Sequence, residues 1–264
     1  MTSGKSVRLM HITRRGKMLC IPMDHAITVG PVKGLEDPEL MVRSVARGGA
    51  TAFLAHKGVL KALRKPPSIG MILHLSASTS LGPSPTRKVL IATVHEGIRL
   101  GADAISLHLN IGSKEEPEML MQLGMAADEC DSLQIPLIAM MYPRGQGIKG
   151  PPGPDTIAHV ARIGAEGGAD IVKTVYTGST ETFREVVRKC PVPVVLAGGA
   201  RVDSDRELLE LAGSAMKAGS MGITFGRNVF EHPAPTSIVR ALRKVVVEGG
   251  TVEEGMEVLG SEAK

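Results

Sequence analysis

The sequence predicts an α/β chain folded as a single closed (β/α)8 barrel, the TIM-barrel architecture. Its main support is a recurring signature in which a helix end runs through glycine into an apolar strand: ARGGATAFLAHKG, RLGADAISLHLN, AEGGADIVKTV and KAGSMGITFGRN. Glycine at a helix end, followed at once by a strand, is typical of repeating β/α units. The length agrees, because such barrels usually need about 250 residues and this chain has 264.

Eight segments have the near-continuous apolar character of strands that are buried on both faces of a parallel sheet. In order, they are Met18–Asp24, Ala52–Lys57, Met71–Ser76, Ala104–Asn110, Leu137–Tyr142, Ile171–Tyr176, Val194–Gly199 and Gly222–Arg227. Eight strands that alternate with helices predict a parallel sheet that closes on itself.

Apolar residues at helical spacing predict the helices between these strands. They are Pro38–Arg47, Thr86–Leu100, Glu118–Asp131, Asp155–Glu166, Glu181–Lys189, Asp203–Ala218 and Pro235–Glu248, while the connection around Val59–Leu63 is short and basic. We expect residues 1–264 to form one domain. Residues 1–15, with Val7, Leu9 and Ile12 among basic residues, are expected to cap the lower mouth of the barrel.

The structural rival is an open doubly wound sheet, which carries a glycine fingerprint for nucleotides after its first strand. A literal match, GQGIKG, occurs only at residues 145–150, and Pro151, Pro152 and Pro154 follow it. A pyrophosphate there would lack the helix N-terminus that normally binds it. We therefore interpret the match as accidental.

The composition narrows the classes of function. The net charge of +4 favours anionic ligands slightly but is too small to indicate nucleic acid, and aromatic residues, at 2%, are too few for base stacking. No apolar run approaches the roughly 18 residues that span a bilayer, and no leader is evident. Three distant cysteines suit a reducing compartment. We expect a cytoplasmic protein that binds small molecules and neither nucleic acid nor membrane.

Polar residues stand at the carboxyl ends of the predicted strands, where barrels of this type hold their catalytic groups. Lys173 instead lies within the sixth strand, on the same face as Ile171 and Val175. Burial disfavours the charged ammonium form, and a neutral amine condenses with carbonyl groups to give an imine. The alternative is a lysine that reaches the rim or pairs with an acid. Lys57, at the second strand end, is the other lysine expected at this mouth.

Other strand ends supply groups that suit this chemistry. Tyr142 and Asp24 can transfer protons at the same mouth. The pair Gly198 and Gly199 at the seventh strand end, and Gly226 with Arg227 at the eighth, suggest a phosphate site. Backbone N–H groups can approach phosphate oxygens at glycine, and the arginine adds positive charge. Alternatively, these glycines only turn the chain.

A metal site is the rival chemistry. His56, His74 and His108 stand on neighbouring predicted strands, with His25 nearby. No closely spaced histidine pair occurs, however, and carboxylates are scarce at these strand ends. Buried histidines bonded to the backbone are the preferred interpretation, and we expect neither a metal nor an organic cofactor.

The motifs PMDHAITVGPVKG, HKG, LIAMMYPRG, ADIVKT, LAGG and FGRNVF stand in the order found in the archaeal-type class I aldolases, the DhnA family. The chain resembles this family over nearly its whole length. It is most similar to synthases that transfer a ketose-phosphate-derived fragment to L-aspartate semialdehyde, on an alternative route to 3-dehydroquinate and the aromatic amino acids. The resemblance also implies a homo-oligomer, since the family often forms rings of ten subunits.

The resemblance assigns roles to individual residues. Lys173 is the imine-forming lysine, Tyr142 the proton donor and Asp24 the proton acceptor. The sugar site would be lined by Asp24 with His25, Ala26, Ile27 and Thr28, and by Tyr142 with Pro143 and Arg144. The phosphate would be held by Gly198, Gly199, Gly226 and Arg227.

Two departures leave the substrate pair open. Ala26 stands where these synthases have glycine, and the loop VLKALRKPPSIG after HKG is shorter and less rich in glycine. Related enzymes condense dihydroxyacetone phosphate with aspartate semialdehyde for aminohydroxybenzoate synthesis, and others are fructose-bisphosphate aldolases, which tend to have tryptophan before YPRG. From a different class, a metal-dependent barrel hydrolase or a non-catalytic sugar-phosphate-binding barrel stays possible.

Overall fold

The computed structural model describes residues 3–262 and contains a closed barrel of eight parallel strands, as predicted. Residues 1–2 and 263–264 of the predicted domain lie outside the described residues. The strands are β1 (Met18–Pro22), β2 (Ala52–Ala55), β3 (Gly70–His74), β6 (Ala104–Ile111), β7 (Leu137–Pro143), β8 (Ile171–Thr174), β9 (Val194–Ala197) and β10 (Gly222–Thr224). All eight predicted strands are therefore confirmed.

The barrel closes where β10 pairs in parallel with β1, with Met18 opposite Gly222. A side chain at position 222 would place its Cβ only 1.9 Å from the carbonyl oxygen of Met18. Glycine is thus required for the last strand to meet the first. Several predicted strands end later than the observed ones. The sixth was predicted as Ile171–Tyr176, but β8 ends at Thr174 because the next residues belong to the loop at the barrel mouth.

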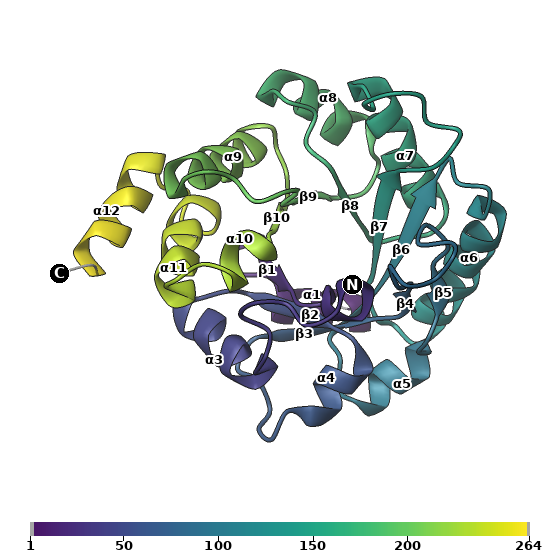
Figure 1. Cartoon of the computed structure of the whole chain (residues 1–264), viewed down its shortest axis with the longest axis horizontal. Coiled ribbons are helices and arrows are strands. Elements are labelled where there is room, and N and C mark those ends of the chain that lie inside the picture. The colour runs from purple at the N-terminus through teal and green to yellow at the C-terminus, as the bar shows by residue number, and fades with distance from the viewer. Residues whose placement is uncertain (1–2, 263–264) are drawn as a thin grey trace.

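Helices form an outer ring around the barrel in Figure 1. The helices of this ring are α3 (Pro38–Gly48), α4 (Lys57–Ala62), α5 (Val94–Arg99), α6 (Glu116–Ser132), α7 (Pro154–Glu166), α8 (Thr180–Lys189), α9 (Asp205–Lys217) and α11 (Pro235–Val246). Several begin at a polar residue whose side chain accepts a hydrogen bond from the first helical turn, including Asp37, Thr93, Ser179 and Ser204. No helix within residues 3–262 is long and apolar enough to cross a membrane.

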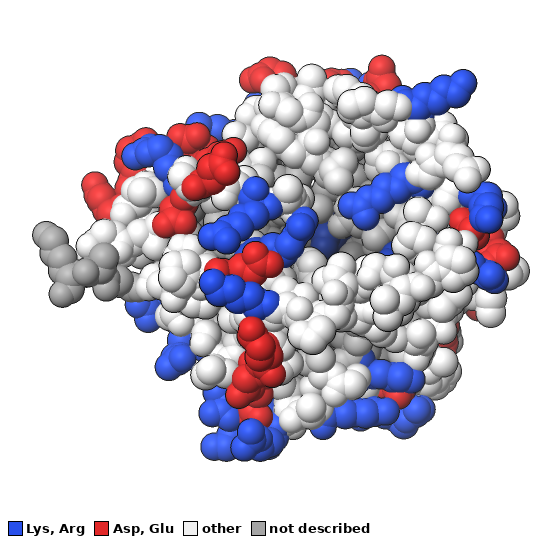
Figure 2. Space-filling view, in the orientation of Figure 1, with Lys and Arg blue, Asp and Glu red and all other residues white. Residues whose placement is uncertain are grey.

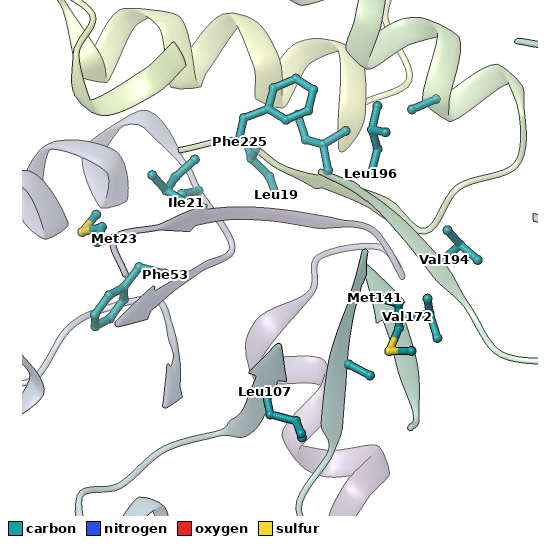
Figure 3. Packing of buried hydrophobic residues seen from close by; sticks show 14 of the residues in the cluster. Leu19, Ile21, Met23, Phe53, Leu107, Met141, Val172, Val194, Leu196 and Phe225 are labelled. Carbon is teal, nitrogen blue, oxygen red and sulfur yellow. The ribbon is translucent and has the colours of Figure 1, made fainter. Parts of the chain in front are cut away.

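Strand alternation divides the buried residues into two layers. One layer packs between the strands and the surrounding helices, and Figure 3 shows Leu19, Phe53, Val172 and Phe225 among its members. The other fills the inside of the barrel, with Cys20, Leu54, Ile72, Met140 and Val195. The inner layer forms a solid floor below the mouth where the polar residues gather.

Helix α1 (Gly4–Ile12) contacts β3 and β6, and its fully buried Ile12 packs against the inner layer. At the other end of the chain, α12 (Val252–Glu262) lies outside the ring, packed on α9 and α11 (Figure 1). Two short helices, α2 (Ala26–Val29) and α10 (Arg227–Phe230), follow β1 and β10 at the polar mouth.

The predicted helix Thr86–Leu100 is wrong in its first half. Residues Val89–Leu90 form β5, which pairs antiparallel with β4 (Ser76–Ala77), and the helix α5 begins only at Val94. Contacts made elsewhere in the fold favour the hairpin, since the side-chain amide of Asn110 donates to the carbonyl oxygen of Thr86 at 2.7 Å. Such contacts override the local helical pattern.

Candidate active site

A cavity of about 410 Å³ lies at the carboxyl ends of the strands. Its polar lining comes from many elements: Asp24, His25, Thr28, His56, His74, Ser76, Lys88, His108, Tyr142, Arg144, Lys173, Thr224 and Arg227, with Gly198, Gly199 and Gly226. Four of these residues are Lys or Arg and one is a carboxylic acid. Figure 2 shows a face of the molecule on which Lys and Arg side chains gather around a central hollow. The cavity therefore suits an anionic ligand.

Lys173 extends into this cavity from the middle of β8. Its neighbours across the sheet are Met140 and Val195, both apolar residues of the inner layer. Val172, the preceding residue, packs on the opposite side under the helices, as the alternation predicted. Only 6% of Lys173 is exposed, and its side chain lines the cavity together with Asp24 and Tyr142.

Asp24 follows β1 and is the carboxylate of the cavity. Its Oδ1 lies 3.5 Å from His25 Nδ1, and its Oδ2 lies 3.9 Å from His74 Nε2. Burial works against ionisation, yet the pKa of the Asp24 carboxyl lies below its ordinary value because His74, His25 and Lys173 face it. A carboxylate that stays ionised in a cavity can accept a proton from a bound ligand.

Tyr142 lies one residue before the end of β7, with 8% of its surface exposed. The His108 ring packs against it at 4.7 Å between centroids, and the Arg144 guanidinium carbon lies 4.5 Å from the centre of its ring. These contacts hold the phenol against the wall of the cavity. Pro143, the next residue, points to the other face of the strand and does not line the cavity.

Three histidines of the cavity, His56, His74 and His108, are bonded to other protein groups. His56 Nδ1 lies 3.2 Å from the carbonyl oxygen of His74, and His74 Nδ1 lies 2.7 Å from Ser106 Oγ. His108 Nε2 lies 2.8 Å from Asn110 Oδ1. Burial lowers the pKa of each of these histidines, in His74 to about 3. Within residues 3–262, no three His, Cys, Asp or Glu side chains are placed to hold a metal ion.

The loops after β9 and β10 are joined to each other. Arg227 Nη2 donates to the carbonyl oxygen of Gly199 at 2.7 Å, and the Asn228 amide donates to the carbonyl oxygen of Ala200 at 3.1 Å. Gly199 has φ +66°, in the left-handed region. At position 226, a Cβ would lie 2.7 Å from the His25 ring, so glycine lets the loop after β10 approach the loop after β1.

Not every predicted position reaches the cavity. His25, Thr28 and Arg144 line it, but Ala26 and Ile27 do not, because the turn of α2 directs them away from it. Lys57 does not line it either, since its Nζ lies 3.2 Å from Glu96.

Lys88 is the charged residue of the cavity that the sequence analysis missed. It lies next to β5, only 8% of it is exposed, and its Nζ donates to Ser78 Oγ at 2.6 Å. The segment was predicted as a helix, so no strand-end rule applied to it. The local sequence RKVLI has no alternation of polar and apolar residues that would have marked Lys88 as buried.

The chain has clear similarity to known proteins. Residues 18–232 match the family described as DeoC/LacD family aldolase. A 2-amino-3,7-dideoxy-D-threo-hept-6-ulosonate synthase from Halobacterium salinarum is 41% identical over 98% of this chain and 97% of the relative. A 2-amino-4,5-dihydroxy-6-oxo-7-(phosphonooxy)heptanoate synthase from Streptomyces griseus is 36% identical, over 94% and 92% of the two chains. A solved structure of a Schiff base-forming fructose-1,6-bisphosphate aldolase superposes with a TM-score of 0.86 at 29% identity, over 91% of this chain and 98% of that one.

Proposed function

The chain belongs to the DeoC/LacD family of aldolases, and we propose that it joins a ketose-phosphate-derived fragment to L-aspartate semialdehyde through a lysine imine. This is the reaction type of a 2-amino-3,7-dideoxy-D-threo-hept-6-ulosonate synthase, the name of the relative with 41% identity. The observation that carries the proposal is the position of Lys173. It is a buried lysine on the inner face of β8, in one cavity with Asp24 and Tyr142.

The chemistry begins with the donor. The unprotonated amine of Lys173 adds to the ketone carbon, and loss of water, with a proton supplied by Tyr142, leaves a protonated imine. This imine withdraws electrons from the neighbouring carbon–carbon bond. Asp24 accepts the proton of the hydroxyl group beyond that bond, the bond breaks, an aldehyde leaves, and an enamine stays on Lys173.

The second half joins the acceptor. The enamine carbon attacks the aldehyde carbon of L-aspartate semialdehyde, and the new alkoxide takes back the proton held by Asp24. Water then adds to the protonated imine, which releases the product ketone, restores the neutral Lys173 amine and returns the proton to Tyr142. We propose that the imine supplies the electron sink, so that the reaction needs no metal.

The donor phosphate has a matching site in this proposal. Gly198 and Gly199 bring backbone close to the cavity, and Arg227 adds a positive charge beside them. This end of the barrel, at the last two strands, is where the fold frequently binds phosphate. Phosphate here directs the ketone of the donor toward Lys173.

A second candidate differs only in the donor. The Streptomyces griseus relative is named for a phosphonooxy heptanoate product, which corresponds to the condensation of dihydroxyacetone phosphate with aspartate semialdehyde. Lys173, Asp24 and Tyr142 would serve that reaction equally well. The absence of tryptophan from the chain makes a fructose-bisphosphate aldolase the less favoured third option.

Purified protein incubated with L-aspartate semialdehyde and a panel of ketose phosphates tests the proposal, with products identified by mass spectrometry. We expect an aminated seven-carbon product with at least one donor, and equal activity after EDTA treatment. Cleavage of fructose bisphosphate with no use of L-aspartate semialdehyde would contradict the assigned acceptor. Loss of activity with EDTA and recovery with zinc would favour the histidine-based metal alternative.

A further inference from the structure

Lys88 is a buried cation that has no role in the reaction proposed above. Its ammonium group donates one hydrogen bond, to Ser78 Oγ, and that hydroxyl in turn donates to the carbonyl oxygen of Pro85 at 2.7 Å. An ammonium group has three N–H donors, so two are left for a ligand. Within residues 3–262, no carboxylate lies within 4 Å of Lys88 Nζ.

The hairpin that carries Lys88 is held firmly against the barrel. Ser76 and Ala77 pair with Leu90 and Val89, and the N–H of Ile91 donates to the carbonyl oxygen of Leu75 at 2.8 Å. Lys88 is therefore fixed in the cavity wall rather than free to extend into solvent. Since burying a lone ammonium is costly, a fixed position of this kind favours an anionic partner that arrives with the ligand.

Arg144 supplies a second positive charge at the same side of the cavity. Its guanidinium stacks on Tyr142, and no carboxylate of the described residues lies within 4 Å of it. The His108 ring packs on the same tyrosine, at 4.7 Å between centroids, and Lys88, His108 and Arg144 all line the one cavity. The charges of Lys88 and Arg144 both act to lower the pKa of His108, after the larger effect of burial.

The order of the strands separates this pair from the phosphate loops. Lys88 follows β3 and Arg144 follows β7, whereas Gly199 and Arg227 follow β9 and β10. β8, with Lys173, stands between β7 and β9. The cavity therefore has cationic groups on two sides of the reacting lysine, and the phosphate of the donor occupies only one of them.

We propose that Lys88 and Arg144 form a second anion subsite, which binds the carboxylate of the acceptor aldehyde. The inference rests on the proposed function and extends it, because it names the group of the acceptor that is recognised. Lys88 thereby determines specificity for aldehydes that carry a carboxylate. Charge-assisted hydrogen bonds of this type typically strengthen binding about tenfold to a hundredfold.

Succinic semialdehyde is propanal with a carboxylate on its terminal carbon, so the two aldehydes differ only in the group that the subsite recognises. We expect Lys88→Met to raise the KM for succinic semialdehyde about tenfold or more, with little change in kcat/KM for propanal. Lys88→Arg should recover much of the difference. Arg87→Met is the matched control: it removes one positive charge from the same hairpin, but Arg87 pairs with Glu118 at 3.0 Å and is half-exposed.

Borohydride trapping of the ketose-phosphate donor in the Lys88→Met variant separates the remaining outcomes. Normal trapping together with a selective loss for succinic semialdehyde supports the subsite. Equal losses for both aldehydes, or weaker trapping of the ketose phosphate, would overturn it and assign Lys88 to the donor or to the fold. A wild-type protein that traps no ketose phosphate would instead refute the proposed function on which the subsite rests.

Discussion

At the level of single residues, strand alternation decides which side chains meet in the cavity. Lys173 and Tyr142 point inward while Val172 and Pro143 point outward. The sequence predicted that Lys173 and Val172 lie on opposite faces of their strand, but not which face lies inside the barrel. Strand alternation does not apply to residues beyond the strand ends. Ile27 was predicted to line the sugar site, but it lies on the turn of α2 and 38% of it is exposed.

Arg227 is predicted to recognise the donor phosphate. Arg227→Ala should weaken the binding of a phosphorylated donor by about tenfold to a hundredfold, because a charge-assisted hydrogen bond is lost. An unphosphorylated analogue should be affected much less when KM values are compared. Arg201→Ala, an exposed residue of the neighbouring loop, is the control. If both analogues lose equally, Arg227 acts only by holding the carbonyl oxygen of Gly199.

The buried histidines predict a dependence of stability on pH. Burial lowers the pKa of His74 from 6.5 to about 3, so between these values the unfolded chain binds a proton that the folded chain does not. Stability must therefore fall as the pH drops through this window, by at most about 1.4 kcal/mol per pH unit for each such histidine. Urea unfolding at pH 7, 6, 5 and 4 measures the slope. His74→Asn should make it shallower, and an unchanged slope in this variant would refute the assignment.

At the level of elements, the sequence predicted the strands, which follow from local periodicity. It missed the hairpin of β4 and β5, which depends on contacts with other parts of the fold. The eight strands are mostly apolar, and glycine marks the helix ends before several of them. The hairpin of β4 and β5 has only two residues in each strand. It is held by Asn110 of β6, which is distant in sequence, and by the carbonyl oxygen of Leu75, which accepts a hydrogen bond outside the β4–β5 pairing. Because Lys88 depends on that hairpin, the second anion subsite was not predictable either.

The prediction that the N-terminal segment caps the lower mouth of the barrel can be tested through helix α1. Ile12 is fully buried against the inner layer, so Ile12→Ala should lower the free energy of unfolding by about 2–5 kcal/mol. Met10, in the same helix, is 61% exposed, and Met10→Ala should have little effect. Kinetic constants of the folded Ile12→Ala protein should match the wild type. Equal stability of the two variants would show that α1 contributes little to closing the barrel.

At the level of the whole molecule, the barrel gathers residues from distant parts of the sequence at one mouth. Asp24 and Arg227 are separated by most of the chain, yet they line one cavity because β10 pairs with β1. The closed topology was predictable from eight repeated units. Assembly into a homo-oligomer, which the family resemblance implies, stays a prediction, and light scattering would measure it against the chain mass of 27.8 kDa.

The imine on Lys173 is the central claim, and borohydride trapping tests it most directly. Reduction in the presence of a ketose phosphate should fix one covalent adduct, and peptide mass mapping should place it on Lys173. Lys173→Met should form no adduct yet unfold like the wild type, because an apolar side chain of similar length is cheaper to bury. An adduct on Lys88, the other lysine that lines the cavity, or no adduct with any ketose phosphate that the enzyme turns over, would contradict the account.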